Sequence, residues 1–101
     1  EKAGQLMKVE KKGRTAVITI GGDLRDNDSR DFVTAVKDLI SEDFKRFTID
    51  FSGVDFIESY SLSNLIILCD RPELDFTFKN TGGPLMKIFD VINFKNRVLF
   101  E

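Results

Sequence analysis

The 101-residue chain contains no histidine and no tryptophan, and it has only one cysteine and two prolines. Without histidine it lacks the commonest general base and the commonest metal ligand of enzymes. A single cysteine, Cys69, excludes an intramolecular disulfide and makes a reducing compartment the default. No apolar run approaches the roughly 20 residues that cross a bilayer, and no secretory signal is present. These absences predict a soluble, cytoplasmic protein that needs no cofactor and no metal.

The sequence also has no large excess of charge of one sign: it contains 15 basic and 17 acidic residues, for a formal net charge of −2. Binding to nucleic acid needs a clustered positive field, so we expect no nucleic-acid partner. The densest basic segment is 8–14, and we expect it to be the solvated edge of a hairpin.

The length is enough for one domain, which we place at residues 1–101, with residues 1–5 expected to be disordered or left over from cloning. Because the chain begins at Glu1 and not at methionine, a fragment of a larger protein is the alternative.

Hydrophobic periodicity predicts alternating strands and helices. Segments 6–11 and 15–20 are predicted strands of a hairpin, and Asp28 is the predicted N-cap of a helix whose apolar face runs to Ile40. The remaining predicted elements are strands at 46–51, 74–79 and 98–100, a helix at 61–69, and a helix that Pro84 opens. For 65–69 a strand is the competing interpretation. The order β-β-α-β-α-β-α-β predicts an α/β domain: a mostly parallel sheet with an N-terminal hairpin and helices packed on it.

Catalytic and nucleotide-binding motifs are missing from the sequence. Neither GxGxxG nor GxxxxGK[ST] occurs, which removes support for a phosphate-binding loop. Cys69 follows apolar residues, and we expect a buried thiol in preference to a nucleophile. The acidic residues between two predicted elements could suggest a divalent cation, but they lack the loop pattern of an EF-hand, and helix capping and dipole compensation explain them without a metal. They are Asp23, Asp26, Asp28 and Asp31. The prediction is therefore a protein that is not an enzyme.

The stretch 54–65, VDFIESYSLSNL, places a carboxylate and hydroxyls where a strand connection meets a predicted helix. One interpretation is that Ser59 caps that helix. The other is that Ser59 accepts a phosphoryl group, because the free N–H groups and positive dipole end of a helix N-terminus favour a phosphate.

Three stretches, in this order, resemble the STAS domain, which is shared by bacterial anti-sigma factor antagonists and by the cytoplasmic tails of sulfate transporters. They are AVITIGGDLRDNDSRDFVTAV at 16–36, FTIDFSGVDFIESYSL at 47–62 and PLMKIFDVINFKNRVLFE at 84–101. The resemblance runs from about residue 14 to residue 101. Gly22-Asp23-Leu24 is similar to the Gly-Glu-Leu-Asp turn of the family, and 58–62 is similar to its Asp-Ser-Ser/Thr-Gly-Leu signature.

The resemblance implies an anti-sigma factor antagonist that binds a serine-kinase anti-sigma factor and lets go when that kinase phosphorylates it. By position Ser59 is the implied phosphorylation site, with Ser61 as second choice. The chain departs from the signature at Tyr60, where a small residue is usual, and at Ser61, where glycine is usual. A tyrosine beside the acceptor either crowds a kinase active site or adds a binding anchor.

Segments 22–28 and 58–65 both follow strand ends, so we expect them to lie at the same edge of the sheet and to contact the partner. A solvated surface is the alternative for each residue. The predicted partner-binding residues are Asp23, Arg25, Asp26, Glu58, Ser59, Tyr60, Ser61 and Asn64. The rival hypothesis is a constitutive STAS subunit of a membrane transport complex, of the phospholipid-trafficking ABC type, without phosphorylation.

Overall fold

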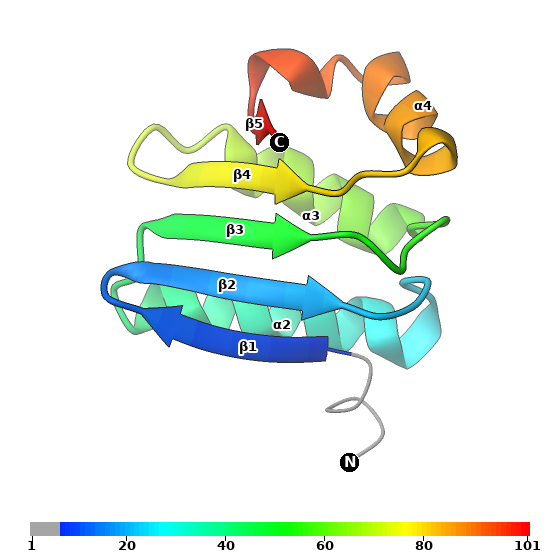
Figure 1. Cartoon of the computed structure of the whole chain (residues 1–101). Coiled ribbons are helices and arrows are strands. Elements are labelled where there is room, and N and C mark those ends of the chain that lie inside the picture. The colour runs from blue at the N-terminus through cyan, green and yellow to red at the C-terminus, as the bar shows by residue number, and fades with distance from the viewer. Residues whose placement is uncertain (1–6) are drawn as a thin grey trace.

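The computed structural model describes residues 7–101, so the expectation for residues 1–5 lies outside the described residues. Five strands form one sheet in the order β1-β2-β3-β4-β5 (Figure 1). They are β1 (Met7–Lys12), β2 (Thr15–Ile20), β3 (Arg46–Asp50), β4 (Asp75–Lys79) and β5 (Leu99–Phe100). The first pair is antiparallel and the other pairs are parallel, which confirms the predicted fold.

Helices α2 (Asp26–Ser41) and α3 (Ser59–Cys69) cover one face of this sheet (Figure 1). Helix α4 (Gly83–Val91) follows β4, and a short 3₁₀ helix, η1 (Phe94–Asn96), leads into β5. Residues 65–69 lie inside α3, so their strand interpretation is wrong. In the part of the chain that the structure describes, no helix has the length and apolarity to cross a membrane.

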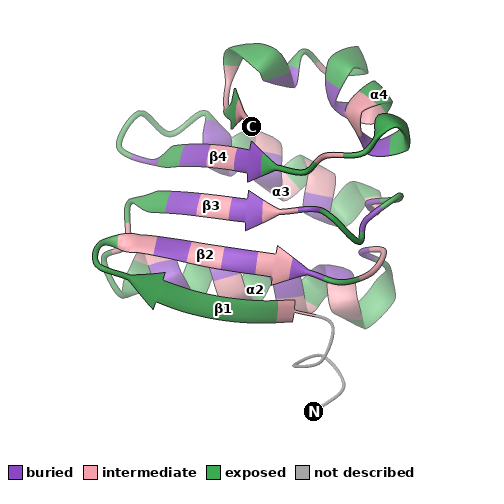
Figure 2. Cartoon of the chain, viewed as in Figure 1, coloured by how far each residue is buried: buried purple, intermediate pink, exposed green. Residues whose placement is uncertain are grey.

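The core lies between the sheet and the helices, and strand alternation builds it. In β2, Ala16, Ile18 and Ile20 are fully buried while the residues between them are half-buried. Strands β3 and β4 repeat this alternation, and β1 is almost wholly exposed (Figure 2). A period of two places successive side chains on opposite faces, so one strand serves both the core and the solvent. The basic segment 8–14 is exposed, as predicted for a hairpin edge.

The uncovered face of the sheet is polar, which is unusual for parallel strands, because they commonly carry helices on both faces. Registered neighbours across β2, β3 and β4 are Thr19, Asp50 and Lys79 in one row. Hydroxyl and charged groups make this face compatible with water. The buried helix-covered face therefore carries the hydrophobic stabilisation.

Aromatic rings fill the half of the core beneath α4. Phe78 and Phe89 lie 5.2 Å apart between ring centroids, and each also contacts Phe51, Phe94 and Phe100. Several of these pairs meet edge to face, the arrangement that the ring quadrupole favours. The cluster fixes the last helix and the last strand against the sheet.

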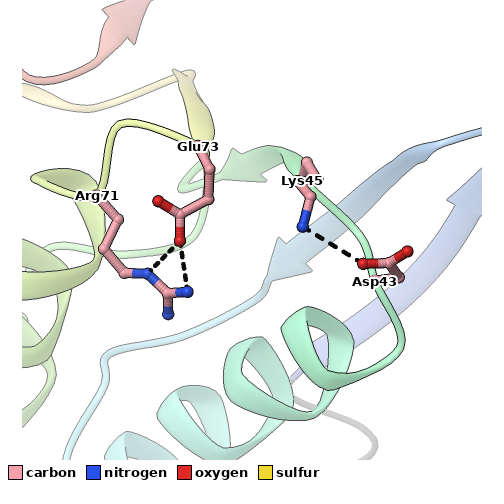
Figure 3. Close-up of polar contacts among 4 residues, drawn as sticks. All are labelled: Asp43, Lys45, Arg71 and Glu73. Atoms are coloured by element: carbon pink, nitrogen blue, oxygen red, sulfur yellow. Dashed lines mark hydrogen bonds and ion pairs between the residues drawn. The ribbon is translucent and has the colours of Figure 1, made fainter.

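The amino-terminal edge of the parallel strands carries local ion pairs. Asp43 and Lys45 approach to 3.3 Å before β3, and Arg71 and Glu73 to 2.5 Å before β4 (Figure 3). Such exposed pairs contribute only about 0–1 kcal/mol each. A hollow of about 210 Å³ at this edge is lined by Gly13, Arg14, Glu42, Asp43 and Phe44. Its carboxylates are engaged, because Lys11 binds Glu42 and Lys45 binds Asp43.

At the opposite, carboxyl-terminal edge, the β2 and β3 loops touch through backbone. A Cβ atom on Gly53 would lie 2.7 Å from the carbonyl carbon of Gly21, closer than real side chains come. Only glycine at position 53 permits this approach.

We predict that Gly53→Ala lowers the free energy of unfolding by about 1–3 kcal/mol, because the methyl group forces backbone to move. Urea denaturation measures the change. Gly83→Ala is the matched control, since a Cβ there meets nothing within 4 Å. Its unfolding free energy should stay constant or rise by up to about 1 kcal/mol, as alanine is the better helix former. Equal losses in both variants would contradict the argument.

Candidate partner-binding and modification site

The segments after β2 and β3 lie side by side and are joined by backbone. Leu24 and Ile57 form an isolated parallel bridge outside the strands. The Leu24 N–H donates to the Phe56 carbonyl at 3.0 Å, and the Glu58 N–H donates to the Leu24 carbonyl at 2.9 Å. The prediction that 22–28 and 58–65 meet at one edge is confirmed.

Asp23 fixes the connection that precedes α3. Its Oδ1 accepts hydrogen bonds from the N–H groups of Asp55, at 2.8 Å, and Phe56, at 3.1 Å. Its Oδ2 lies 3.6 Å from the Arg25 guanidinium, which in turn lies 4.1 Å from the centre of the Phe56 ring. Asp23 and Arg25 therefore organise this surface as well as facing solvent.

Glu58 is the N-cap residue of α3, but its carboxylate binds another segment. Glu58 Oε1 accepts a 2.5 Å hydrogen bond from the backbone N–H of Asp26. Asp26 has a φ of 50°, in the left-handed region that aspartate tolerates better than most residues. The long-range bond thus coincides with the tight turn where α2 begins.

The predicted N-cap of α2 is wrong. The N-cap residue is Arg25, which makes no side-chain cap, and Asp28 lies in the first turn of the helix. The Arg25 carbonyl accepts from the N–H groups of Asp28, at 3.0 Å, and Ser29, at 3.3 Å. Asp26 and Asp28 still lie where the helix dipole favours negative charge. Sequence reasoning placed the cap locally, whereas the first N–H is bound by a carboxylate 32 residues away.

Ser59 is the first residue of α3 and is exposed. The interpretation of Ser59 as the helix cap is wrong, because Glu58 occupies that position and, among the described residues, no side-chain cap closes α3. An exposed hydroxyl in the first turn lies next to N–H groups that have no partner within the helix. This location is compatible with chemical modification.

Ser61 is buried, with no exposed surface, which contradicts its prediction as a partner contact and as a second phosphorylation site. Its Oγ lies 2.5 Å from the Ser29 Oγ and donates to the Ser29 carbonyl at 3.1 Å. Buried hydroxyls need such partners, because an unpaired one costs about 1–3 kcal/mol. Ser61 therefore joins α3 to α2 inside the protein.

The outer surface of α3 carries no charged side chain over its eleven residues. Tyr60 is 47% exposed and Ile67 is 64% exposed, two turns apart on the helix. Asn64 lies between them and donates its side-chain N–H to the Tyr60 carbonyl at 2.8 Å. Depletion of charge and exposure of aromatic rings are typical of the centre of a protein interface.

Two residues of this surface, Phe56 and Ile67, were missed by the sequence prediction. Phe56 is 36% exposed beneath the Arg25 guanidinium. The sequence signal that could have indicated its exposure is its position in an irregular segment after the Gly53 turn. Ile67 belongs to an apolar run in which periodicity does not separate buried from exposed positions.

The loop after β4, which contains Asn80, also lies at the carboxyl-terminal edge and contacts Asp50 at the end of β3. Burial alone raises the pKa of Asp50, but hydrogen bonds from the Asn80 side chain and the Ser52 N–H outweigh it and lower that pKa. Asp50 therefore stays ionised and holds the β3 and β4 loops together.

The described residues include no group of three or more histidine, cysteine or carboxylate side chains that could hold a metal ion. The Asp23–Asp31 set is dispersed into hydrogen bonds and the first turn of α2. Cys69 is buried as predicted, and burial raises the pKa of its thiol to about 12.

Comparison with known proteins places this geometry in context. A family model described as "Mlab, STAS domain" matches residues 7–100. The anti-sigma factor antagonist SpoIIAA in its unphosphorylated form superposes with a TM-score of 0.78 and 14% identity over 94% of this chain and 87% of its own. The Bacillus cell fate determinant SpoIIAA in the phosphorylated form gives 0.72 and 16% over 94% and 90%. An anti-sigma factor antagonist from Mycobacterium paratuberculosis gives 0.79 and 17% over 93% and 82%.

A sulfate transporter family protein from Wolinella succinogenes superposes with a TM-score of 0.68 and 18% identity, over 90% of this chain and 80% of its own. At these identities the superpositions establish a shared fold. No curated protein sequence matches the chain.

We predict that Ser61→Ala lowers the free energy of unfolding by about 1–3 kcal/mol, because it leaves the buried Ser29 hydroxyl without its partner. Ser29→Ala should cost less, because the Ser61 hydroxyl keeps its bond to the carbonyl of residue 29. The double variant should lose clearly less than the sum of the two, as expected for coupled residues. Urea denaturation of the four proteins measures the cycle. The exposed Ser63→Ala should change stability by less than about 0.5 kcal/mol. Additive losses would show that the two hydroxyls act separately.

We also predict that Cys69 resists alkylation in the native protein at pH 8. With a thiol pKa of about 12, the folded protein holds about a thousandfold less thiolate than an exposed cysteine. Iodoacetamide modification followed by intact-mass measurement tests this, with the urea-unfolded protein as the control that reacts. Rapid modification of the folded protein would contradict both the burial and the raised pKa.

Proposed function

Because the chain belongs to this STAS domain family, we propose that it is a cytoplasmic anti-sigma factor antagonist. In this proposal it binds a serine-kinase anti-sigma factor and releases it when Ser59 is phosphorylated. The observation that carries the proposal is the exposed Ser59 at the first position of α3, bordered by the uncharged helix surface and the 22–26 loop.

The proposed modification is an ordinary phosphoryl transfer supplied by the partner. The Ser59 oxygen forms a bond to the γ-phosphorus of ATP, the bond from that phosphorus to the ADP oxygen breaks, and the hydroxyl proton passes to a base of the kinase. Phosphoserine adds about −1.5 to −2 charges at neutral pH. The new charge lies beside Glu58 and close to Asp26, on a surface that is already acidic.

Partner release follows from this electrostatics. Tyr60 and Phe56 are the exposed aromatic groups of the surface, and aromatic anchors commonly provide much of the binding energy of an interface. A dianion placed next to Tyr60 must be desolvated when the partner covers it, and it repels any carboxylate that the partner presents. Binding through this surface is therefore weakened by phosphorylation.

We propose that the protein acts by binding its partner and has no catalytic activity of its own. The chain offers no histidine, and its one thiol is held neutral in the core. The carboxylates of the site accept backbone hydrogen bonds, as Asp23 and Glu58 do, and so serve the structure of the loops.

The second candidate is a constitutive STAS subunit of a membrane transport complex. The observation that favours it is the Tyr60-Ser61 pair. Tyr60 projects beside the acceptor with 47% exposure, and Ser61 fills the position of the signature glycine with a buried hydrogen bond. A permanent contact through Tyr60 needs no phosphoryl acceptor. Copurification with a transporter ATPase, and no phosphate, would distinguish this candidate.

We predict that incubation of the protein with ATP and a lysate of its source organism adds one phosphate to the wild type and none to Ser59→Ala. Intact-mass spectrometry measures the addition, and Ser63→Ala, an exposed serine of the same helix, is the matched control that still gains phosphate. A verified kinase substrate in the same lysate guards against an inactive extract. Absence of phosphate on every form would rule out the phosphorylation switch and favour the constitutive subunit.

A further inference from the structure

We propose that Glu58 holds the start of α2 in place through its hydrogen bond to Asp26, and that phosphorylation of Ser59 breaks this bond. The inference rests on the proposed function, since it assigns a conformational consequence to the same modification. It makes Glu58 a positioning residue for the 22–28 loop, and it predicts that the loop changes shape when the partner is released.

The Glu58–Asp26 hydrogen bond is a charge-assisted contact between two segments. The carboxylate accepts the Asp26 N–H at 2.5 Å, and this N–H belongs to the first residue of α2, where no helical acceptor is available. Hydrogen bonds to charged groups contribute more to stability than neutral ones. The Asp26 φ of 50° is a conformation that needs support from its surroundings.

A phosphate on Ser59 acts on this bond directly. Ser59 follows Glu58 in the chain, so their Cα atoms are about 3.8 Å apart, well inside the distance over which salt screens exposed charges. The dianion repels the Glu58 carboxylate, and the N–H groups at the start of α3, which no side chain caps, can bind the phosphate there. Rotation of the Glu58 side chain towards solvent relieves the repulsion and leaves the Asp26 N–H without an acceptor.

The neighbouring contacts limit the change to the loop. The Leu24 N–H binds the Phe56 carbonyl at 3.0 Å, and Asp23 holds the N–H groups of residues 55 and 56; none of these acceptors is on Glu58. Ser29 is fixed by Ser61 within the core. Residues 25–28 therefore form the segment whose position can change between two fixed points, with the bonds of the Arg25 carbonyl to the N–H groups of Asp28 and Ser29 kept.

The length of the Glu58 side chain matters to this arrangement. Aspartate is shorter by one methylene and would need the two segments to approach more closely to make the same bond. Glutamine has the same reach and an acceptor oxygen, but no charge for the phosphate to repel. The two substitutions thus separate reach from charge.

The test uses purified full-length protein with phosphoserine placed at residue 59 by chemical ligation, and it measures amide hydrogen exchange by NMR. We expect Asp26 exchange to accelerate roughly tenfold or more, as for loss of a charge-assisted hydrogen bond. Leu24 exchange should stay unchanged. Nearby negative charge alone slows base-catalysed exchange, so acceleration reports bond opening.

Phosphoserine at 63, on the same helix, is the matched control and should leave Asp26 protected. In Glu58→Gln, phosphoserine 59 should no longer accelerate Asp26, and Glu58→Asp should already exchange faster without phosphate. Unchanged Asp26 exchange in the phosphoserine 59 protein would overturn the inference, as would equal acceleration of Leu24 or equal acceleration by phosphoserine 63. Because the phosphate is installed chemically, this result is independent of whether the lysate kinase modifies Ser59, which decides the proposed function.

Discussion

The parallel pairing of β2 with β3 is the constraint on which the rest of the site depends. Its register sets Thr15 opposite Arg46 and Thr19 opposite Asp50, so both strands end at the same level. Two chain segments that are about thirty residues apart then leave the sheet side by side. From this follow the Leu24–Ile57 bridge, the backbone contact of Gly21 with Gly53, and the meeting of α2 with α3. A shift by one residue would move every core side chain of β2 to the solvent face.

The site that results is a surface held in shape by polar bonds between loops. Backbone N–H groups bind the carboxylates of Asp23 and Glu58, and buried hydroxyls join the two helices behind them. The charged groups that organise the loops also set the potential of the surface, which is acidic around an uncharged helix. The same side chains therefore determine both the geometry of the loops and the charge that a partner would meet. A change at Asp23 alters loop geometry and partner electrostatics together.

Much of the fold was predictable from the sequence because strands and helices have periods that side-chain burial must obey. Alternation in β2, β3 and β4, and the apolar stripe of α2, gave the element order and the parallel sheet. The meeting of the two loops also followed, since parallel strands end at one edge. The N-terminal residues of the helices could not be predicted in the same way. The Asp26 N–H is bound by Glu58, and no local sequence pattern indicates a cap from a residue so far along the chain.

The burial of individual residues in α3 was likewise beyond prediction. An uncharged helix shows little contrast between its faces, so the sequence does not reveal that the polar Ser61 is fully buried and the apolar Ile67 largely exposed. The structure separates them through packing against α2. Ser61, whose role was mistaken, has its hydrogen-bond partner on another helix.

The Ser29–Ser61 pair also has a consequence for the history of the chain. The Ser29 hydroxyl has its hydrogen-bond partner in Ser61, whereas the Ser61 hydroxyl also donates to the Ser29 carbonyl, which any residue at position 29 would offer. A serine at position 61 therefore has an internal partner whatever residue stands at position 29, whereas a serine at position 29 has one only when position 61 already carries serine. Lineages that carry this pair are thus expected to have gained the serine at position 61 first, so the interior of the protein constrains the order of the two mutations.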